Sequence, residues 1–144
     1  MPFQWLQMRI TEENDRRRRE ADTLERLPRV MDEVHRAIAE CIEAYTAAFG
    51  KESIEMSYFL RKLRITIRES KEGKWEKAGK IEVSTIAKPP SLHIDRNGDA
   101  FDIEVGLLTE DKLYYKEGDK FLTMEELTRR ILDRPLFPKL GAET

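Results

Sequence analysis

The side chains of this sequence that could carry chemistry are two histidines, one cysteine and two carboxylates on one strand face. His35 falls at the edge of a helical apolar stripe, whereas His93 alternates with apolar residues in an expected strand and is predicted to point to solvent. Cys41 lies on the apolar stripe, where an unpaired cysteine usually acts as a small buried hydrophobe. Asp102 and Glu104 lack the apolar surroundings that raise the pKa of a general acid. These residues give no positive evidence for an enzyme.

The stretch DRNGD puts Asp95, Asn97 and Asp99 at the spacing of the first ligands of a calcium loop. Later positions of such a loop need glycine and glutamate, and the sequence has Ala100 and Gly106 there. A hairpin turn explains the stretch instead. The sequence has no zinc-ligand spacing, no phosphate-binding glycine loop and no nucleophile elbow. We therefore expect no metal, no cofactor and no catalytic residue.

Four consecutive arginines, Arg16 to Arg19, suggest either a nucleic-acid arm or a solvated helix. Between residues 9 and 26, six arginines are matched by six acids, whereas basic arms are blocks of one charge. Several acids precede an arginine by four residues, the favoured orientation for a helical ion pair; these pairs are Glu12–Arg16, Glu13–Arg17, Asp15–Arg19 and Asp22–Arg26. We interpret the segment as a solvated helix with Thr11 as its N-cap.

An apolar stripe with heptad spacing follows the arginines. Its members alternate at intervals of three and four residues, which predicts a helix that buries this face against a helix or a sheet. They are Leu24, Leu27, Met31, Val34, Ile38, Cys41 and Tyr45. Pro28 lies inside the pattern, where it disfavours helical geometry at the preceding residue and removes a hydrogen bond. We expect an N-terminal helix that is kinked or broken near Pro28, with two helices over 11–26 and 28–49 as the favoured arrangement.

Apolar side chains also gather ahead of the charged helix. They are Phe3, Trp5, Leu6, Met8 and Ile10. If the helix projects from the domain, this patch is exposed and is expected to seek a partner chain or, less readily, a membrane surface. If the chain instead turns back at Pro28, the patch covers part of the sheet. The sequence leaves both arrangements open.

From Ser53 onward the apolar period changes to two, which is typical of strands with one buried face. Strands are predicted within 54–58, 63–67, 75–83, 92–94, 101–105 and 113–115, with a possible return at Phe121. Thr123 and Glu126 form a capping box ahead of a short helix that Pro135 ends. We predict an α+β fold in which the long N-terminal helix packs on an antiparallel meander of five or six strands with a short C-terminal helix. Residues 1–50 form the arm and residues 51–144 the sheet and last helix, within one compact domain.

Charges in the sheet region are segregated. Residues 61–80 carry a balance of +5 and residues 95–111 a balance of −5. The two stripes either lie side by side and neutralise one another, or recognise a partner by complementary charge. Lys62, Arg64 and Arg68 on one strand face, near Trp75, are candidate phosphate contacts of a nucleic-acid surface.

Composition limits the class of protein further. The chain has 144 residues, enough for one domain, and a net charge of −2, so no overall field attracts it to DNA or anionic membranes. One cysteine agrees with a reducing cytoplasm, and no apolar run is long enough to span a bilayer. Our first hypothesis is a non-enzymatic cytoplasmic interaction protein that forms a homodimer, or binds a partner protein helix, through the heptad stripe. The alternatives are a nucleic-acid module using the hairpin 61–80, and a small-molecule-binding domain or enzyme with a pocket between helix and sheet.

Overall fold

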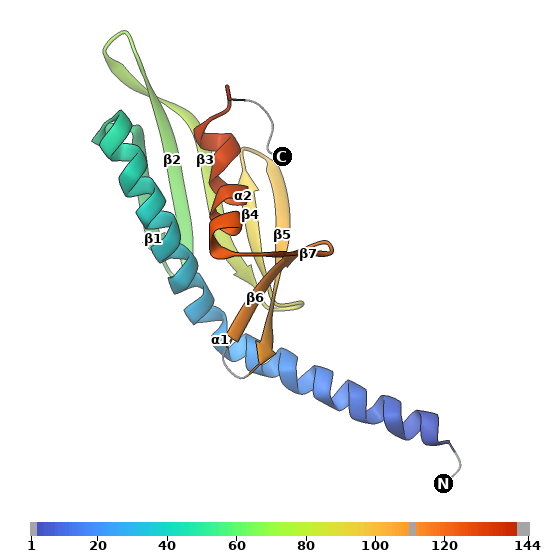
Figure 1. The fold of residues 1–144 in the computed structure, drawn as a ribbon. Coiled ribbons are helices and arrows are strands. Elements are labelled where there is room, and N and C mark those ends of the chain that lie inside the picture. Colours follow the sequence, from blue (N-terminus) through green and yellow to red (C-terminus); the bar gives the residue numbers. More distant parts are fainter. Residues whose placement is uncertain (1–2, 110–111, 141–144) are drawn as a thin grey trace.

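A computed structural model describes residues 3–109 and 112–140 of the chain. The fold is α+β, with a long helix first, an antiparallel sheet next and a short helix last (Figure 1). The elements are α1 (Gln4–Phe49), the 3-10 turn η1 (Lys51–Ser53), β1 (Ile54–Phe59), β2 (Lys62–Lys71), β3 (Lys74–Ile86), β4 (Ser91–Arg96), β5 (Asp99–Thr109), β6 (Lys112–Glu117), β7 (Lys120–Leu122) and α2 (Met124–Leu136).

The sheet is a meander in which each strand pairs antiparallel with the next, from β1 to β7. It has seven strands, more than the five or six predicted, and β7 is only three residues long. Asn97 and Gly98 both have positive φ, as a two-residue hairpin turn requires. Ile67 faces Gly79 whereas Arg68 faces Lys77, so the pairing of β2 with β3 contains a β-bulge beside Gly79.

One face of the sheet is covered by the C-terminal half of α1 and by α2 (Figure 1). Alternate residues of the strands point into this layer, and the stripe of α1 supplies the opposite wall. The side chains with no exposed surface are Val30, Met31, Val34, Ile38, Leu63, Ile65, Ile81, Val83, Leu92, Ile94, Ile103, Leu127 and Ile131. Side chains therefore fill the space between the C-terminal half of α1 and the sheet.

The helix α1 is continuous from Gln4 to Phe49, so the prediction of two separate helices is wrong. It bends in its middle part, coloured light blue in Figure 1, the stretch that contains Pro28. Pro28 is exposed, so the carbonyl of Leu24 that loses its helical donor can bond water instead. Buried residues on both sides of the proline, Leu27 and Val30, hold the two halves in register.

The predicted start of the helix at Thr11 is also wrong. The helix begins at Gln4 after Phe3, which occupies the N-cap position with a positive φ. Thr11 lies inside α1, where its hydroxyl donates to the carbonyl of Gln7 at 3.1 Å.

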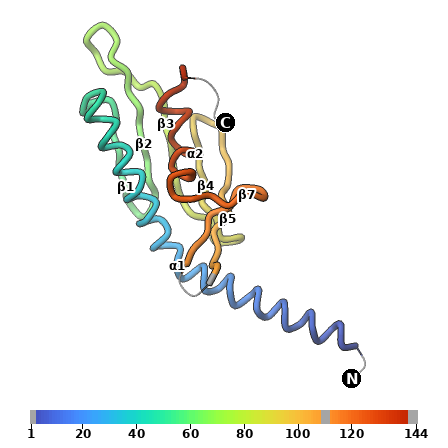
Figure 2. The backbone as a smooth tube through the Cα atoms, in the orientation of Figure 1, coloured from blue at the N-terminus to red at the C-terminus, as the bar shows by residue number. Residues whose placement is uncertain are grey.

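The N-terminal half of α1 projects beyond the sheet, and its first turns lie far from every strand (Figures 1 and 2). The alternative in which the chain folds the apolar patch back onto the sheet is therefore wrong. None of the described helices combines the length and the apolar character needed to cross a membrane.

The helix α2 begins with the predicted capping box. The Thr123 hydroxyl accepts from the backbone N–H of Glu126 at 3.1 Å, and the Glu126 carboxylate accepts from the backbone N–H of Thr123 at 3.1 Å. The helix continues through Pro135 to Leu136, slightly further than predicted, because the buried Leu136 packs its last turn into the core.

Candidate functional site

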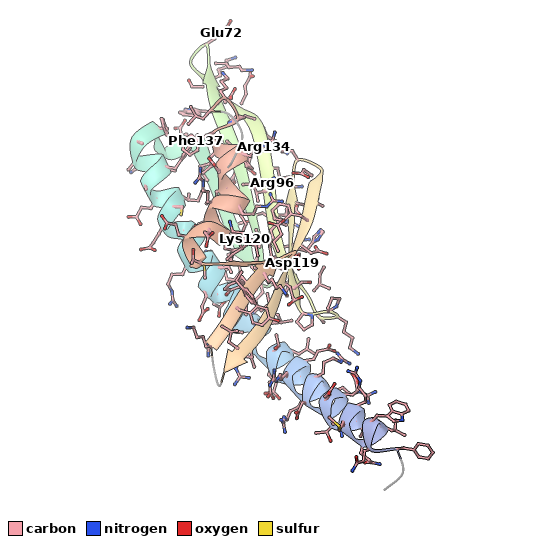
Figure 3. All side chains as sticks on the ribbon, turned by 45° about the vertical axis from the view of Figure 1, so that its right-hand side comes forward. Glu72, Arg96, Asp119, Lys120, Arg134 and Phe137 are labelled. Atoms are coloured by element: carbon pink, nitrogen blue, oxygen red, sulfur yellow. The ribbon has the colours of Figure 1, made fainter. Side chains whose placement is uncertain are left out.

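The end of the projecting helix is apolar and exposed. Its apolar side chains, which we call the tip patch, are Phe3, Trp5, Leu6, Met8 and Ile10. Trp5 is 65% exposed and Met8 is 64% exposed, values unusual for residues this large and apolar. Figure 3 shows the side chains of the first turns of α1 extending into open space, with no strand or other helix beside them.

Between the tip patch and the sheet, α1 is held by ion pairs within the helix. Arg9 pairs with Glu12 at 2.9 Å, and Arg18 pairs with Asp15 at 2.8 Å. Arg16 bridges Glu13 and Glu20. Among the predicted pairs, Glu13–Arg17 forms at 3.9 Å, and Arg26 donates to the backbone carbonyl of Asp22 at 2.9 Å. Glu12 and Asp15 pair with arginines three residues away. Three of the four consecutive arginines are thus paired with acids of their own helix, in agreement with a solvated helix.

The heptad stripe, predicted as an interface, lies mostly in the core of this chain. Leu27, Met31, Val34 and Ile38 are buried against the sheet. Leu24, Cys41 and Tyr45 keep part of their surface exposed. The four buried members are covered by the chain's own strands, so only the other three offer surface to a second chain in this fold.

A crevice of about 690 Å³ opens where α1 leaves the sheet. Its helix side includes Glu12, Asp15, Arg16, Arg19, Glu20 and Thr23, and its sheet side includes Pro89, Gly106, Leu108, Tyr114 and Phe121. Leu108 and Phe121 are exposed there. The Tyr114 hydroxyl donates to the Glu104 carboxylate at 2.7 Å, and burial followed by this bond raises the pKa of Tyr114 to about 12. Gly106 lies directly under the Tyr114 ring, which leaves no room for a Cβ.

A second groove, of about 480 Å³, runs between the C-terminal parts of α1 and α2. Tyr45, Phe49 and Phe137 form an aromatic cluster in it, with ring centroids 4.8 to 6.4 Å apart. Figure 3 shows Phe137 at the end of α2 that lies beside α1. Arg129 and Asp133 pair across one turn at its polar rim. The partly exposed Cys41 also lines this groove.

The candidate phosphate contacts Lys62, Arg64 and Arg68 are exposed or half-buried and lie on the open face of the sheet. Lys62 and Arg64 both approach Glu82 at 3.8 Å, and Arg68 pairs with Glu55. These pairs join strands within the basic half of the sheet, so its charge is partly neutralised locally. Nucleic-acid binding by this hairpin stays a prediction.

Sequence reasoning missed a contact between a histidine and a carboxylate. His93 of β4 lies opposite Asp102 of β5, with 2.6 Å between Nδ1 and Oδ1. The two-residue turn at Asn97 and Gly98 was the signal, because it fixes which residues of the two strands face one another.

Ser84 of β3 lies opposite His93 on its other side, so a serine, a histidine and an aspartate form a row across three strands. A nucleophile must lie within hydrogen-bond reach of its base. Among the described residues, no hydrogen bond joins the Ser84 hydroxyl to His93. His93 and Asp102 are also substantially exposed, so the row lacks the enclosed surroundings in which such a constellation acts. We interpret it as a set of cross-strand polar contacts.

The other histidine, His35, stacks on Tyr58, with ring centroids 4.2 Å apart. The Tyr58 hydroxyl donates to Asp32 at 2.7 Å, and partial burial together with this bond raises the pKa of Tyr58 to about 12. The contact joins α1 to β1 and is structural. Within residues 3–109 and 112–140, no three His, Cys, Asp or Glu side chains are grouped closely enough to hold a metal ion.

We compared the chain with protein-family models, with curated proteins and with solved structures, and no match was found in any of the three.

Proposed function

We propose that this protein is a non-enzymatic cytoplasmic interaction module that associates through the tip patch of α1, with a second copy of the chain as its first partner. One observation carries the proposal. Large apolar side chains, including Trp5 and Phe3, occupy the exposed end of a helix that no other part of the described chain covers.

The composition of the tip patch supports binding to protein. Contiguous exposed apolar surface is costly in water and often marks an interaction site. Tryptophan is among the residues that contribute most to protein interfaces, because its large rigid ring buries much apolar area when it enters a pocket. The arm between patch and sheet is polar on all sides, so the apolar patch is isolated at its end.

The core holds the projecting N-terminal half of α1, from here on called the arm, in a defined position, which favours binding. The C-terminal half of α1 is fixed to the sheet by the buried stripe, and the helix continues without interruption to the patch. A preformed binding element loses less conformational entropy on association than a disordered one. In this proposal the heptad stripe positions the interacting segment and does not itself form the interface.

Sedimentation equilibrium tests the proposal. The full chain is expected to be heavier than a monomer at micromolar concentration, and the double variant Trp5→Lys with Met8→Lys is expected to be a monomer. The matched control is Phe59→Lys with Leu60→Lys, which places two lysines at the end of β1 and in the turn that follows it, at residues that are 74% and 84% exposed. The control should keep the mass of the full chain. A full chain that stays monomeric at every concentration would show that self-association is not its function.

A further inference from the structure

We propose that the crevice beside α1 receives Trp5 and Met8 of a second copy, so that the two arms lie antiparallel in a two-fold symmetric dimer. This inference rests on the proposed function and names the surface that the tip patch meets. Each copy has both a tip patch and a crevice. The patch of each copy can therefore enter the crevice of the other, and these two identical contacts complete a closed dimer.

The spacing along α1 puts two of the five tip-patch residues, Trp5 and Met8, on the face that borders the crevice. Residues of this face recur every three or four positions, as a helix requires. They are Trp5, Met8, Glu12, Asp15, Arg19 and Thr23, and the last four line the crevice. Leu6 and Ile10 belong to the opposite face. Trp5 and Met8 are therefore directed to the side from which an antiparallel arm would approach.

The distance along the helix also fits. The middle of Trp5 and Met8 is about eleven residues from the middle of the crevice, roughly 17 Å at the rise of an α-helix. In an antiparallel pair of arms, each residue lies opposite a residue of the other copy, and here the two residue numbers add to about 24. This register would place each tip patch beside the other copy's crevice. In this register Met8 of one copy faces Arg16 of the other, and Trp5 faces Arg19.

The crevice offers the contacts that a tryptophan needs. Leu108 and Phe121 supply exposed apolar surface, and the carboxylates of Glu20 and Glu104 are acceptors for an indole N–H. Within the described part of the chain, Arg19 makes no ion pair, unlike the three arginines before it. Arg19 lines the crevice, and its guanidinium would lie on the face of the partner's indole ring, a favourable cation–π contact.

Charges along the shared face are compatible with the antiparallel register. Arg9 of one arm would face Asp15 of the other, an attractive pair made twice. Glu12 would lie near its own counterpart at the two-fold axis, but Arg9 of the same helix neutralises it at 2.9 Å. Complementary charges of this kind fix the register of an interface more than they add to its affinity.

Cross-linking of single-cysteine chains tests the geometry. Cys41→Ser removes the native thiol, and Met8→Cys or Leu108→Cys is then added to separate preparations. When the two are mixed with a short bis-maleimide, we expect a covalent heterodimer between them. Ile10→Cys replaces Met8→Cys as the matched control, because residue 10 lies on the opposite face of the same turn, and it should give little heterodimer with Leu108→Cys.

The outcomes separate this inference from the proposed function. The native chain could be a dimer in which Ile10→Cys and Met8→Cys cross-link equally to Leu108→Cys, or in which neither of them cross-links. Either result would show that the docking site is wrong while self-association stands. If the native chain is a monomer by sedimentation, both are wrong. As a second measurement, Arg19→Met should weaken the dimer roughly two- to five-fold by loss of the cation–π contact, and an unchanged dissociation constant would overturn the Trp5–Arg19 register.

Discussion

Glu82 of β3 sits among three cations on the open face of the sheet. Lys80 lies 2.8 Å away, and Lys62 and Arg64 lie 3.8 Å away. The hydrogen bond from Lys80, followed by the charges of all three neighbours, lowers the pKa of the Glu82 carboxyl below its usual value, against the opposing effect of partial burial. One acid therefore joins β2 to β3 in the middle of the most basic part of the chain.

The first prediction concerns the pH dependence of this cluster. Because the pKa of Glu82 is lower in the folded than in the unfolded chain, it stabilises the fold above the unfolded value near 4.3, and this contribution is lost as pH falls through the folded pKa. Glu82→Gln should lower the free energy of unfolding by about 0.5–1 kcal/mol at pH 7, a size typical of partly exposed pairs. Urea unfolding of both proteins measures the difference, which should become smaller as the pH falls through the folded pKa of Glu82.

Glu76→Gln serves as the control for that experiment, since Glu76 is exposed on the same strand. This variant should leave the free energy of unfolding unchanged both at pH 7 and at acidic pH. An equal loss in both variants would mean that net charge, and not the cluster around Glu82, is responsible.

The helix α1 contains two parts with different tasks. Its C-terminal half packs the stripe on the sheet, whereas its N-terminal half contacts solvent on most sides. A heptad pattern predicted which face is buried but not what buries it, because a sheet and a partner helix both accept the same spacing. Pro28 did not divide the helix, since packing on either side outweighs the loss of one hydrogen bond at an exposed position.

The second prediction follows from the burial of the stripe. Met31→Ala and Ile38→Ala should each lower the free energy of unfolding by about 2–5 kcal/mol, because each leaves a cavity in a filled core. Chemical denaturation measures this. Leu24→Ala is the comparison. Because Leu24 keeps exposed surface, this substitution should lower the free energy of unfolding by less. If the alanine variants kept full stability and changed only the sedimentation mass, the stripe would be an interface after all.

At the scale of the whole molecule, the chain divides into a body and a projecting arm. The body has one core shared by α1, α2 and the strands, so the helix that carries the arm cannot be separated from the sheet. The arm adds exposed apolar surface at its far end without adding to that core. An association through the arm would therefore leave the body unchanged.

The third prediction uses this division. A chain that starts at Ala21 should fold with the same sheet, lose little stability and sediment as a monomer, because it keeps every buried residue of α1. A chain that starts at Lys51 should fail to fold, because its sheet loses the stripe that covers it. Circular dichroism and sedimentation compare the two. A folded, monomeric chain from Lys51 would contradict the assignment of α1 to the core.

The strands, the short helix and the solvated arm were predictable from the sequence. Alternation of apolar residues identified the sheet, and Asn97 with Gly98 fixed a turn whose geometry also sets the pairing of His93 with Asp102. Thr123 and Glu126 located the start of α2. Each of these signals is local, since it depends on the conformational preferences of a few consecutive residues. The strand β7 was harder to predict, because its three residues, with Phe121 and Leu122 adjacent, are too few to show an alternation of apolar and polar residues.

Only the tertiary structure decided what covers the stripe, where the arm points and which surfaces border it. The stripe could have met a second chain, and the arm could have folded back at Pro28, without any change in local pattern. The choice depends on the sum of many contacts between residues distant in the chain, such as Met31 and Ile38 with the strands. The sequence by itself determined which face of each element would be buried and, apart from the start and the continuity of α1, which segments would be helix or strand. Tertiary packing alone determined what lies against each buried face.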